Sequence, residues 1–359
     1  MTNIPHNAVE RINKSPSKNP AIAVWELTLQ CNLRCVHCGS SAGNARAEEL
    51  STTEALHLCQ DLAALGCAGV ALMGGEVFLR QDWQTIAHEI KRQGMVLSLI
   101  TNGYVNPDHI IPQLCDLGTD CVMVGLDGAS AASHDAIRGV HGSFEKARRF
   151  LKAAKQANLQ TSAITTIHKS NFQELPKILE IVLEEDISWQ LQEAIPIGRF
   201  PRDQVLTEEE YYTLGLFIHS TQKKYATRDR SIIGAHNFGF HSAHLPNLST
   251  YPSWEGCYAG SMVVGIQSNG NIKGCLALSD DFVEGNVRKR SLGAIWNDPT
   301  AFRYSRYFNR KELGTNCRQC KFSASCKGGC TTRSTSMTGM PHNDPLCFYR
   351  FEQEKLICG

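Results

Sequence analysis

The chain has 359 residues, of which 42% are apolar and 20% are charged, so it carries enough apolar material to build a sizeable core. Its 36 basic and 35 acidic side chains leave a formal net charge of +1, which gives no basic field for nucleic acid or an anionic membrane. No apolar run approaches the roughly 20 residues that cross a bilayer, and the polar start lacks the apolar core of a secretion signal. We therefore expect a cytoplasmic protein with two domains, or one barrel with an appendage.

The first half of the chain alternates strand patterns with amphipathic helix patterns. The intervening helices have capping boxes, Ser51 with Glu54 for a helix that ends at Gly66, and Ser170 with Gln173 for a helix near 171–184. This alternation predicts an α/β fold with a parallel sheet, open or partly closed into a barrel, and six units fall short of the eight of a complete barrel. The six predicted strands are residues 21–29, 68–73, 96–101, 121–126, 161–167 and 188–194.

The second half of the chain has a different pattern. Thr207 and Glu210 cap one more helix, and a long polar stretch without clear periodicity follows it. Ser268-Asn269-Gly270 then separates two apolar runs, which predicts a hairpin with a tight primed turn. The chain therefore divides into an N-terminal extension (1–20), a barrel (21–199), a connector (200–256) and a C-terminal domain (257–359).

The 15 cysteines are clustered rather than evenly spread. They make up about 4% of the chain, below the level of small disulfide scaffolds, and in a cytoplasmic protein such clusters indicate metal or redox chemistry. Cys31, Cys35 and Cys38 form one group near the start, and no cysteine occurs between Cys121 and Cys257. The sequence therefore predicts one metal site near the start and a second, cysteine-rich region at the end.

Several motifs follow directly after predicted strands, where a parallel sheet gathers its loops on one rim. In chain order they are the three cysteines, Gly74-Gly75-Glu76, Thr101-Asn102-Gly103, Asp127-Gly128 and Gly198-Arg199. Three closely spaced thiolates can hold three irons of a cubane cluster and leave the fourth iron open to a chelating small molecule. The alternative is a zinc site, which needs a fourth ligand; His37 lies inside the motif and could join only if the loop bends tightly.

The segment Cys31-Asn-Leu-Arg-Cys35-Val-His-Cys38 resembles the CxxxCxxC signature of radical S-adenosylmethionine (SAM) enzymes. The resemblance implies a partial (β/α)6 barrel, a [4Fe–4S] cluster whose open iron binds SAM, reductive cleavage of SAM to a 5′-deoxyadenosyl radical, and an electron donor such as flavodoxin or ferredoxin. It also implies a carboxylate contact from an arginine, since a guanidinium suits a bidentate carboxylate. The expected SAM-binding residues are His37, Gly74, Gly75, Glu76, Asn102, Asp127 and Arg138. Three positions depart from the family pattern: Val77 replaces a common Pro, Gly125 replaces a common Ser, and His37 replaces the usual aromatic residue but would still offer a flat face to the adenine.

The C-terminal cysteines resemble the SPASM domain, which carries auxiliary [4Fe–4S] clusters in peptide-modifying radical SAM enzymes. The matching pattern is Cys257-x12-Gly270-x4-Cys275, then Cys317-x2-Cys320-x5-Cys326-x3-Cys330, then Cys347. The resemblance implies that Cys317, Cys320, Cys326 and Cys347 bind one cluster and that Cys257, Cys275 and Cys330 bind the other, which makes three clusters in all. The second set lacks a fourth cysteine, and a zinc ribbon is the alternative reading of the whole pattern.

These resemblances imply an enzyme that uses the radical to remove a hydrogen from a ribosomally made peptide, with a cross-link or new bond as the product. A leader peptide or a separate recognition protein would assist, and no catalytic acid or base is assigned. A peptide epimerase, maturation of a heme- or quinone-type cofactor, and a zinc-binding protein without turnover remain alternatives. Leu276 follows Cys275 where formylglycine-forming maturases have an Asp base, which argues against that reaction. An epimerase needs a thiol donor, and Cys59, Cys67, Cys115 and Cys121 are expected away from the rim.

Overall fold

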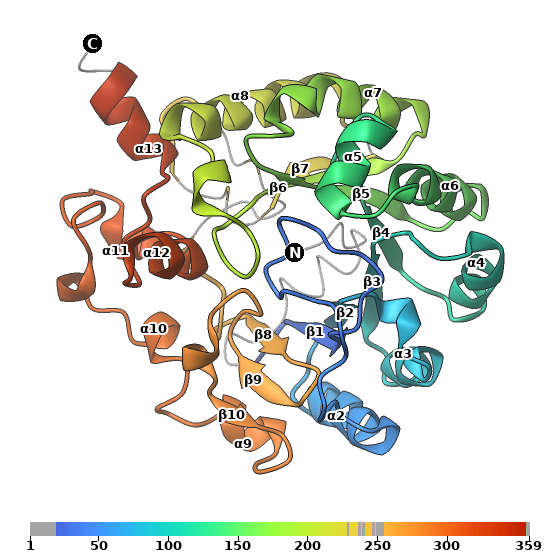
Figure 1. Ribbon diagram of the computed structural model, residues 1–359. Coiled ribbons are helices and arrows are strands. Elements are labelled where there is room, and N and C mark those ends of the chain that lie inside the picture. Colours follow the sequence, from blue (N-terminus) through green and yellow to red (C-terminus); the bar gives the residue numbers. More distant parts are fainter. Residues whose placement is uncertain are drawn as a thin grey trace.

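The computed structural model describes residues 19–227, 230–235, 238, 241–245, 248 and 255–356. Nearly all of the predicted N-terminal extension, parts of the predicted connector, and Cys358 near the end of the chain lie outside these residues. The described chain alternates strands and helices in its first half and has short helices in its last hundred residues (Figure 1).

One ten-stranded sheet runs through the described structure, in the order β10-β9-β8-β1-β2-β3-β4-β5-β6-β7. Strands β1 to β8 pair in parallel, and β9 and β10 pair antiparallel at one end. The six strands predicted from sequence are confirmed with small shifts at their ends. The strands are β1 (Ile22–Thr28), β2 (Gly69–Gly74), β3 (Val96–Thr101), β4 (Cys121–Gly125), β5 (Thr161–Ile167), β6 (Ser188–Glu193), β7 (Ile232–Gly234), β8 (Val263–Ile266), β9 (Asn271–Lys273) and β10 (Gly285–Asn286).

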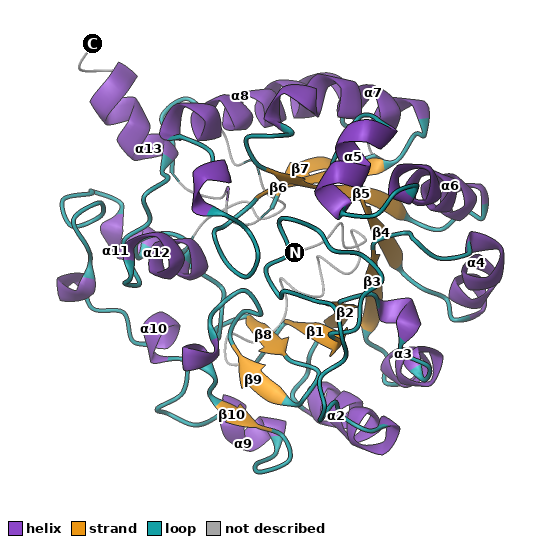
Figure 2. Cartoon of the chain, viewed as in Figure 1, coloured by secondary structure: helices purple, strands orange, loops and turns teal. Residues whose placement is uncertain are grey.

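Helices cover the outer face of the curved sheet, and the loops at the carboxyl ends of the strands surround its centre (Figures 1 and 2). Apolar residues on the outward face of the strands, such as Trp25 and Trp189, are completely buried. The larger helices are α2 (Thr52–Ala64), α3 (Trp83–Arg92), α4 (Pro107–Asp116), α5 (Ala131–Arg138), α6 (Ser143–Gln156), α7 (Leu175–Glu184), α8 (Glu208–Tyr225) and α12 (Thr331–Thr338). The shorter ones are α9 (Leu292–Trp296), α10 (Arg303–Arg306), α11 (Ser323–Cys326) and α13 (Phe348–Phe351).

The capping predictions are confirmed at two helices and wrong at a third. Ser51 with Glu54 caps α2, and Thr207 with Glu210 caps α8. The hydroxyl of Ser170 instead lies 2.7 Å from Nδ1 of His168, and a short 3-10 turn precedes α7. The Ser170 hydroxyl therefore contacts the His168 imidazole instead of capping the helix as predicted.

The predicted connector contributes a strand, which the sequence analysis missed. Strand β7 pairs in parallel with β6 and extends one end of the sheet. It has only three residues, Ile-Ile-Gly, which is too short for a period of two to stand out.

The predicted hairpin is present, but its turn is of a different type. Strands β8 and β9 pair antiparallel, and the amide of Gly270 donates to the carbonyl of Gln267 at 2.9 Å. Only Gly270 in this turn has a positive φ, 85°, so Asn269 does not take the left-handed conformation of a primed turn. Strand β8 also pairs in parallel with β1, which joins the C-terminal region to the barrel sheet.

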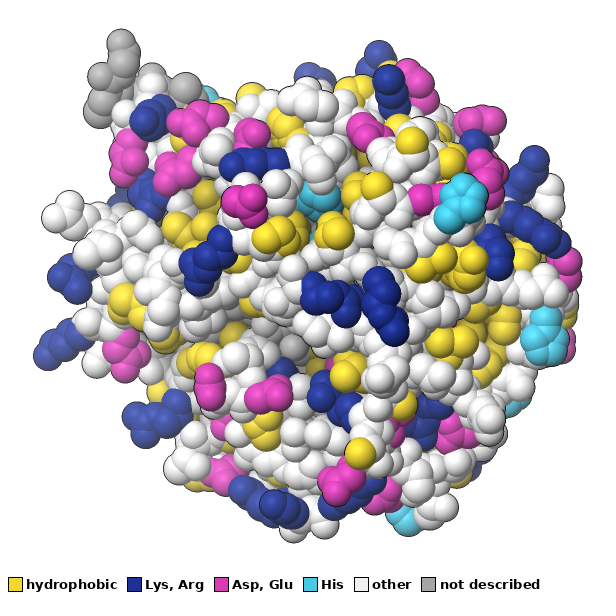
Figure 3. Space-filling model, in the orientation of Figure 1, with side chains coloured by type: hydrophobic (Ala, Val, Ile, Leu, Met, Phe, Trp, Pro, Cys, Tyr) yellow, Lys and Arg dark blue, Asp and Glu magenta, His cyan; other side chains and the backbone are white. Residues whose placement is uncertain are grey.

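The surface of the molecule carries charges of both signs scattered over the face seen in Figure 3. Among the described residues, no helix is both long enough and apolar enough to cross a membrane.

Candidate active site

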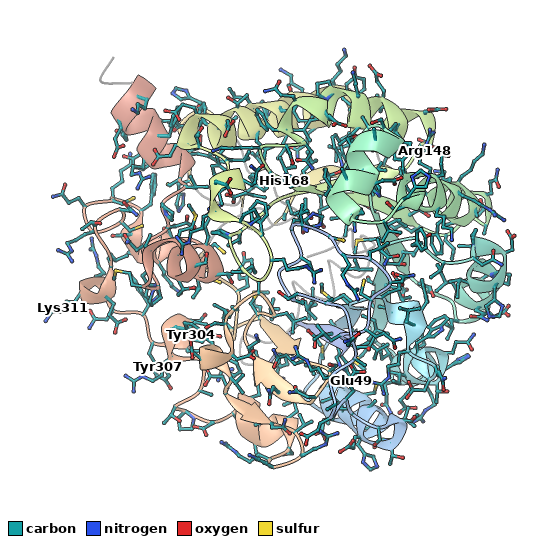
Figure 4. All side chains as sticks on the ribbon, in the orientation of Figure 1. Glu49, Arg148, His168, Tyr304, Tyr307 and Lys311 are labelled. Carbon is teal, nitrogen blue, oxygen red and sulfur yellow. The ribbon has the colours of Figure 1, made fainter. Side chains whose placement is uncertain are left out.

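The first cysteine group lies in the loop that leaves β1. Glu49, labelled in Figure 4, fixes the start of this loop: its Oε1 accepts hydrogen bonds from the Leu29 amide at 2.8 Å and the Thr28 hydroxyl at 3.1 Å. Within the loop, backbone amides donate to sulfur, from Leu33 to Cys31 Sγ at 3.4 Å and from Ala42 to Cys38 Sγ at 3.3 Å. Such N–H donors stabilise negative charge on sulfur, which is what a thiolate ligand requires.

The Gly74-Gly75-Glu76 segment packs directly against the end of β1. A Cβ on either glycine would collide with the carbonyl oxygens of Thr28 or Gln30, and the amides of Gly75 and Glu76 donate to those same oxygens at 2.8 and 2.7 Å. From the sequence, these glycines were expected to bind SAM. The structure shows that the neighbouring backbone already requires them, although both glycines also line the central cavity.

Glu76 is buried, and its side chain accepts hydrogen bonds from residues of the rim. Its Oε1 accepts from the Thr101 hydroxyl at 2.8 Å, and its Oε2 accepts from the Asn102 amide at 2.8 Å. Burial raises the pKa of Glu76 to about 7, despite these hydrogen bonds. Glu76 is absent from the residues that line the cavity, so its carboxylate positions Asn102 in this structure.

Asn102 lines the cavity and links the end of β3 to the cysteine loop. Its Nδ2 donates to Asn32 Oδ1 at 2.7 Å and lies 3.7 Å from Cys31 Sγ. The side chain therefore joins the predicted cluster loop to the predicted cofactor rim.

Arg138 connects the cysteine loop to the end of β4. Its Nη2 lies 2.7 Å from Asp127 Oδ2, and its Nη1 lies 3.9 Å from Cys35 Sγ. A Cβ at Gly125 would come within 2.6 Å of its guanidinium carbon, so glycine at this position makes room for the arginine. The Nε of Arg138 is buried and has no hydrogen-bond partner among the described residues, which leaves it available to an anion at the cavity wall.

His37 lines the cavity beside this ion pair, whereas Asp127 lies behind it. His37 Nε2 lies 3.4 Å from Asp127 Oδ2. Burial lowers the pKa of His37 to about 4, although Asp127 opposes the shift, so the imidazole is neutral near pH 7. His168, which directly follows β5 and is labelled in Figure 4, lies near it, with ring centroids 6.0 Å apart and ring planes tilted by 33°.

The loop after β6 is hydrogen-bonded to the cysteine loop. This contact was not predicted from the sequence. Arg199 Nη1 donates to the carbonyl of Ala42 at 2.7 Å, and its Nε donates to the carbonyl of Cys35 at 3.2 Å. Gly198 has a φ of +60° and packs on the carbonyls of Cys38 and Gly39, where a side chain would collide. The sequence feature that could have indicated this contact is Gly198-Arg199, which follows a predicted strand at the rim.

The C-terminal cysteines were expected to form two ligand sets. Cys257, Cys275 and Cys330 all line the central cavity. Burial raises the pKa of Cys330, and the neighbouring Cys257 adds to the rise. Tyr304, labelled in Figure 4, lies beside this group, and its hydroxyl accepts from the Gly274 amide at 3.2 Å.

The other expected ligand set contains Cys317, Cys320, Cys326 and Cys347. Burial raises the pKa of Cys326, and Cys347 and Cys317 raise it further. Burial likewise raises the pKa of Cys347 to about 11, and Cys320 is among the groups that add to this rise. Cys330 of the first set also packs against Cys326 and Cys347, so the two expected sets adjoin one another.

No three His, Cys, Asp or Glu side chains among the described residues lie close enough to hold a single metal ion. A zinc site needs its ligands around one point. A cubane cluster binds each cysteine to a different iron and so does not require that closeness.

A cavity of about 430 Å³ joins the first cysteine group to the set of Cys257, Cys275 and Cys330. Its floor is built from alternate residues of neighbouring strands, because successive side chains of a strand point to opposite faces. The apolar floor residues are Ile22, Val24, Ala71, Met73, Ile100 and Ile164. Cys59, Cys67, Cys115 and Cys121 do not line this cavity, as the sequence analysis expected.

Strand β6 and helix α12 meet at the cavity wall in a buried charge network. Arg333 pairs with Glu193 and, at 2.7 Å, with Asp344 Oδ1. Asp344 Oδ2 also accepts from the amide of Cys330 at 2.8 Å. Sequence reasoning missed Glu193 and Arg333, because 140 residues separate them.

Comparison with known proteins gives two family matches. A family described as the radical SAM superfamily matches residues 25–182, and the SPASM family, described as an iron–sulfur cluster-binding domain, matches residues 257–321.

Relatives match over nearly the full length. The AdoMet-dependent heme synthase of Methanosarcina barkeri is 29% identical over 92% of this chain and 97% of its own. The mycofactocin maturase MftC of Mycobacterium ulcerans is 30% identical over 91% of this chain and 88% of its own. Among solved structures, Streptococcus suis SuiB bound to its precursor peptide SuiA has a TM-score of 0.72 at 16% identity, over 95% of this chain and 78% of that one.

Proposed function

This chain belongs to the radical SAM superfamily and carries a SPASM domain, and we propose that it oxidatively modifies a ribosomally made peptide. A solved structural relative is bound to a precursor peptide, and a relative in sequence is named a mycofactocin maturase. These names support the substrate class, and the enzyme class follows from the family.

The cofactor assignment is part of this proposal. Cys31, Cys35 and Cys38 would hold the cluster that binds SAM, and the two C-terminal groups would hold the two auxiliary clusters, three in all. When bound, this cofactor set supplies the 5′-deoxyadenosyl radical and accepts the electron that an oxidised product must lose. The hydrogen bonds to sulfur and the unpartnered Nε of Arg138 fit these groups.

The residues of the chain would divide the remaining work. Arg138 would bind the SAM carboxylate, and Asn102, Gly74 and Gly75 would contact the rest of the molecule at the rim. His37 is neutral near pH 7 and would offer a flat face to the adenine. The apolar floor would exclude water from the reacting C–H bond.

The observation that carries the peptide assignment is the charge of the cavity wall. Among the described residues that line the cavity, the basic side chains are Arg138 and Arg199. Arg138 already pairs with Asp127, and Arg199 already donates to backbone carbonyls. A ligand with several carboxylates needs several arginine or lysine partners once it is buried, whereas a peptide side chain does not.

Tetrapyrrole modification is the second candidate, because several relatives are named heme synthases and one is named an Fe-coproporphyrin III synthase. One experiment separates the two. The anaerobically reconstituted enzyme is given SAM, a reductant and either iron-coproporphyrin III or short peptides encoded beside its gene. A peptide product lighter by two hydrogens supports the proposal.

Two other outcomes would replace the proposal. Conversion of the porphyrin with no change in any peptide would favour the second candidate. A peptide of unchanged mass that gains one deuterium from D2O would indicate epimerisation. The described cysteines outside the two ligand regions do not line the cavity, which leaves a thiol hydrogen donor unsupported among them.

A further inference from the structure

Two buried oxygen atoms on strand β6 have no hydrogen-bond partner within the described part of the chain. Glu193 Oε1 and Gln190 Oε1 each lack a hydrogen bond among the described residues, and both residues line the cavity. Buried polar atoms are nearly always hydrogen-bonded, so two unpaired acceptors on one wall are unusual. Both atoms can only accept, and a ligand that satisfies them must therefore donate.

The charge around Glu193 adds to this demand. Arg333 carries one positive charge and lies between two carboxylates, Glu193 and Asp344, so the ionised trio has a net charge of −1. All three side chains are buried, at 0%, 0% and 2% exposure. A buried charge without a partner is costly, and a cation brought by a ligand would balance it.

We propose that this wall is a subsite for a positively charged, hydrogen-donating group of the substrate, such as the ammonium of an amine-bearing side chain or of a peptide N-terminus. The ammonium would donate to Glu193 Oε1, while the carbon chain that carries it lies on the apolar floor. The inference rests on the proposed function in taking this cavity as the substrate site, and it adds a chemical class to the substrate.

Arg333 holds the carboxylate of Glu193 in place through its other oxygen. The arginine is itself held by Asp344 and by the carbonyl of Leu346, to which its Nη2 donates at 3.0 Å. Helix α12 thus fixes from the C-terminal domain a group that belongs to the barrel. A site supported in this way is rigid before the ligand arrives, which lowers the entropy cost of binding.

Ionisation of Glu193 predicts a pH dependence. Burial raises the pKa of Glu193 to about 6, and Arg333 opposes this rise while Asp344 adds to it. Below that pH the carboxyl is protonated and neutral, and it attracts an ammonium weakly. Binding of a cation should therefore strengthen as the pH rises from 5 to 7.

The test uses n-hexylammonium, n-hexanol and n-hexanoate as probes of equal chain length. Their binding to the reconstituted enzyme is measured by calorimetry without reductant. SAM is present so that it occupies Arg138 and hexanoate does not bind there. A charged hydrogen bond contributes about 1.5–3 kcal/mol, so we expect the ammonium to bind roughly tenfold or more tightly than the alcohol or the anion.

Two variants locate the effect. Glu193→Gln keeps the shape of the side chain and should weaken hexylammonium about tenfold, with hexanol unchanged and the pH dependence lost. Glu352→Gln is the matched control, since Glu352 is also buried but does not line the cavity, and this variant should bind hexylammonium as the parent does. If Glu193→Gln fails to take up iron, the comparison of the three probes in the parent still decides whether the subsite prefers an ammonium.

Equal binding of hexanoate and hexylammonium would overturn the subsite, as would unchanged binding of hexylammonium to Glu193→Gln. A peptide that is modified although no amine binds would refute the subsite and leave the proposed function standing. Amine binding without modification of any peptide would support the subsite and refute the proposed function.

Discussion

Replacing Gly125 with alanine should displace the Arg138 guanidinium from its place against β4. The new Cβ would lie 2.6 Å from the guanidinium carbon and 2.8 Å from Nη1, whereas carbon and its neighbours prefer about 3.5–4.0 Å. Nη2 of Arg138 lies nearer still to the new Cβ, so the guanidinium must move by more than about 1 Å, which breaks the 2.7 Å contact of Nη2 with Asp127.

The expected loss of stability follows from two effects. Overpacking of a buried site costs about 1–3 kcal/mol, and separation of a buried ion pair costs about 3–5 kcal/mol when it is complete. Since the pair is stretched rather than removed, we expect the free energy of unfolding to fall by about 2–4 kcal/mol.

The measurement is urea unfolding of the reconstituted enzyme without SAM, followed by tryptophan fluorescence. Gly293→Ala is the control, because its Cβ would meet only Leu65 at 3.9 Å, an ordinary contact. Calorimetry should also show SAM binding weakened about tenfold in Gly125→Ala, which corresponds to about 1.4 kcal/mol. If Gly125→Ala unfolds at the same urea concentration as the parent, the packing argument is wrong.

Three further predictions concern the rim and the product. Changing Cys31, Cys35 and Cys38 together to Ala should abolish 5′-deoxyadenosine formation and leave about two-thirds of the iron, as counted by iron analysis, since two of three clusters would remain. Burial raises the pKa of Glu76 to about 7, so this group stabilises the fold fully below about pH 4.3 and loses that contribution as the pH rises through 7. Urea midpoints from pH 5 to 7 should therefore fall less in Glu76→Gln than in the parent, and parallel curves would contradict the assignment. The enzyme should not convert a sulfatase-type peptide to formylglycine, because Leu276 lines the cavity and cannot accept a proton. Mass spectrometry of the peptide after the reaction tests this.

The sequence located the rim because its information is local. Each strand carries its own apolar pattern, and each motif follows its strand within a few residues, so the order of the parallel sheet brings the motifs together. The same reasoning placed His37, Asn102 and Arg138 near the first cysteine group, where the structure has them.

What the sequence could not show depends on distant partners. The pairing of Glu193 with Arg333 spans 140 residues, and no local pattern records it. Glu76 has the same difficulty, because only the structure shows that its carboxylate faces Thr101 and the Asn102 amide rather than the cavity. Gly125 looked like a departure from the family pattern until the guanidinium of Arg138 was seen against it.

The parallel pairing of β1 with β8 affects the order in which the chain can fold. More than 230 residues separate the two strands, so at about 5–20 residues per second the ribosome delivers β8 roughly 12–50 s after β1. During that interval one edge of β1 has no neighbour, and an open strand edge can pair with another nascent chain. Strand β8, which closes this edge, is thus synthesised after all the other strands of the parallel sheet, and a chain cut before residue 257 would keep the edge bare.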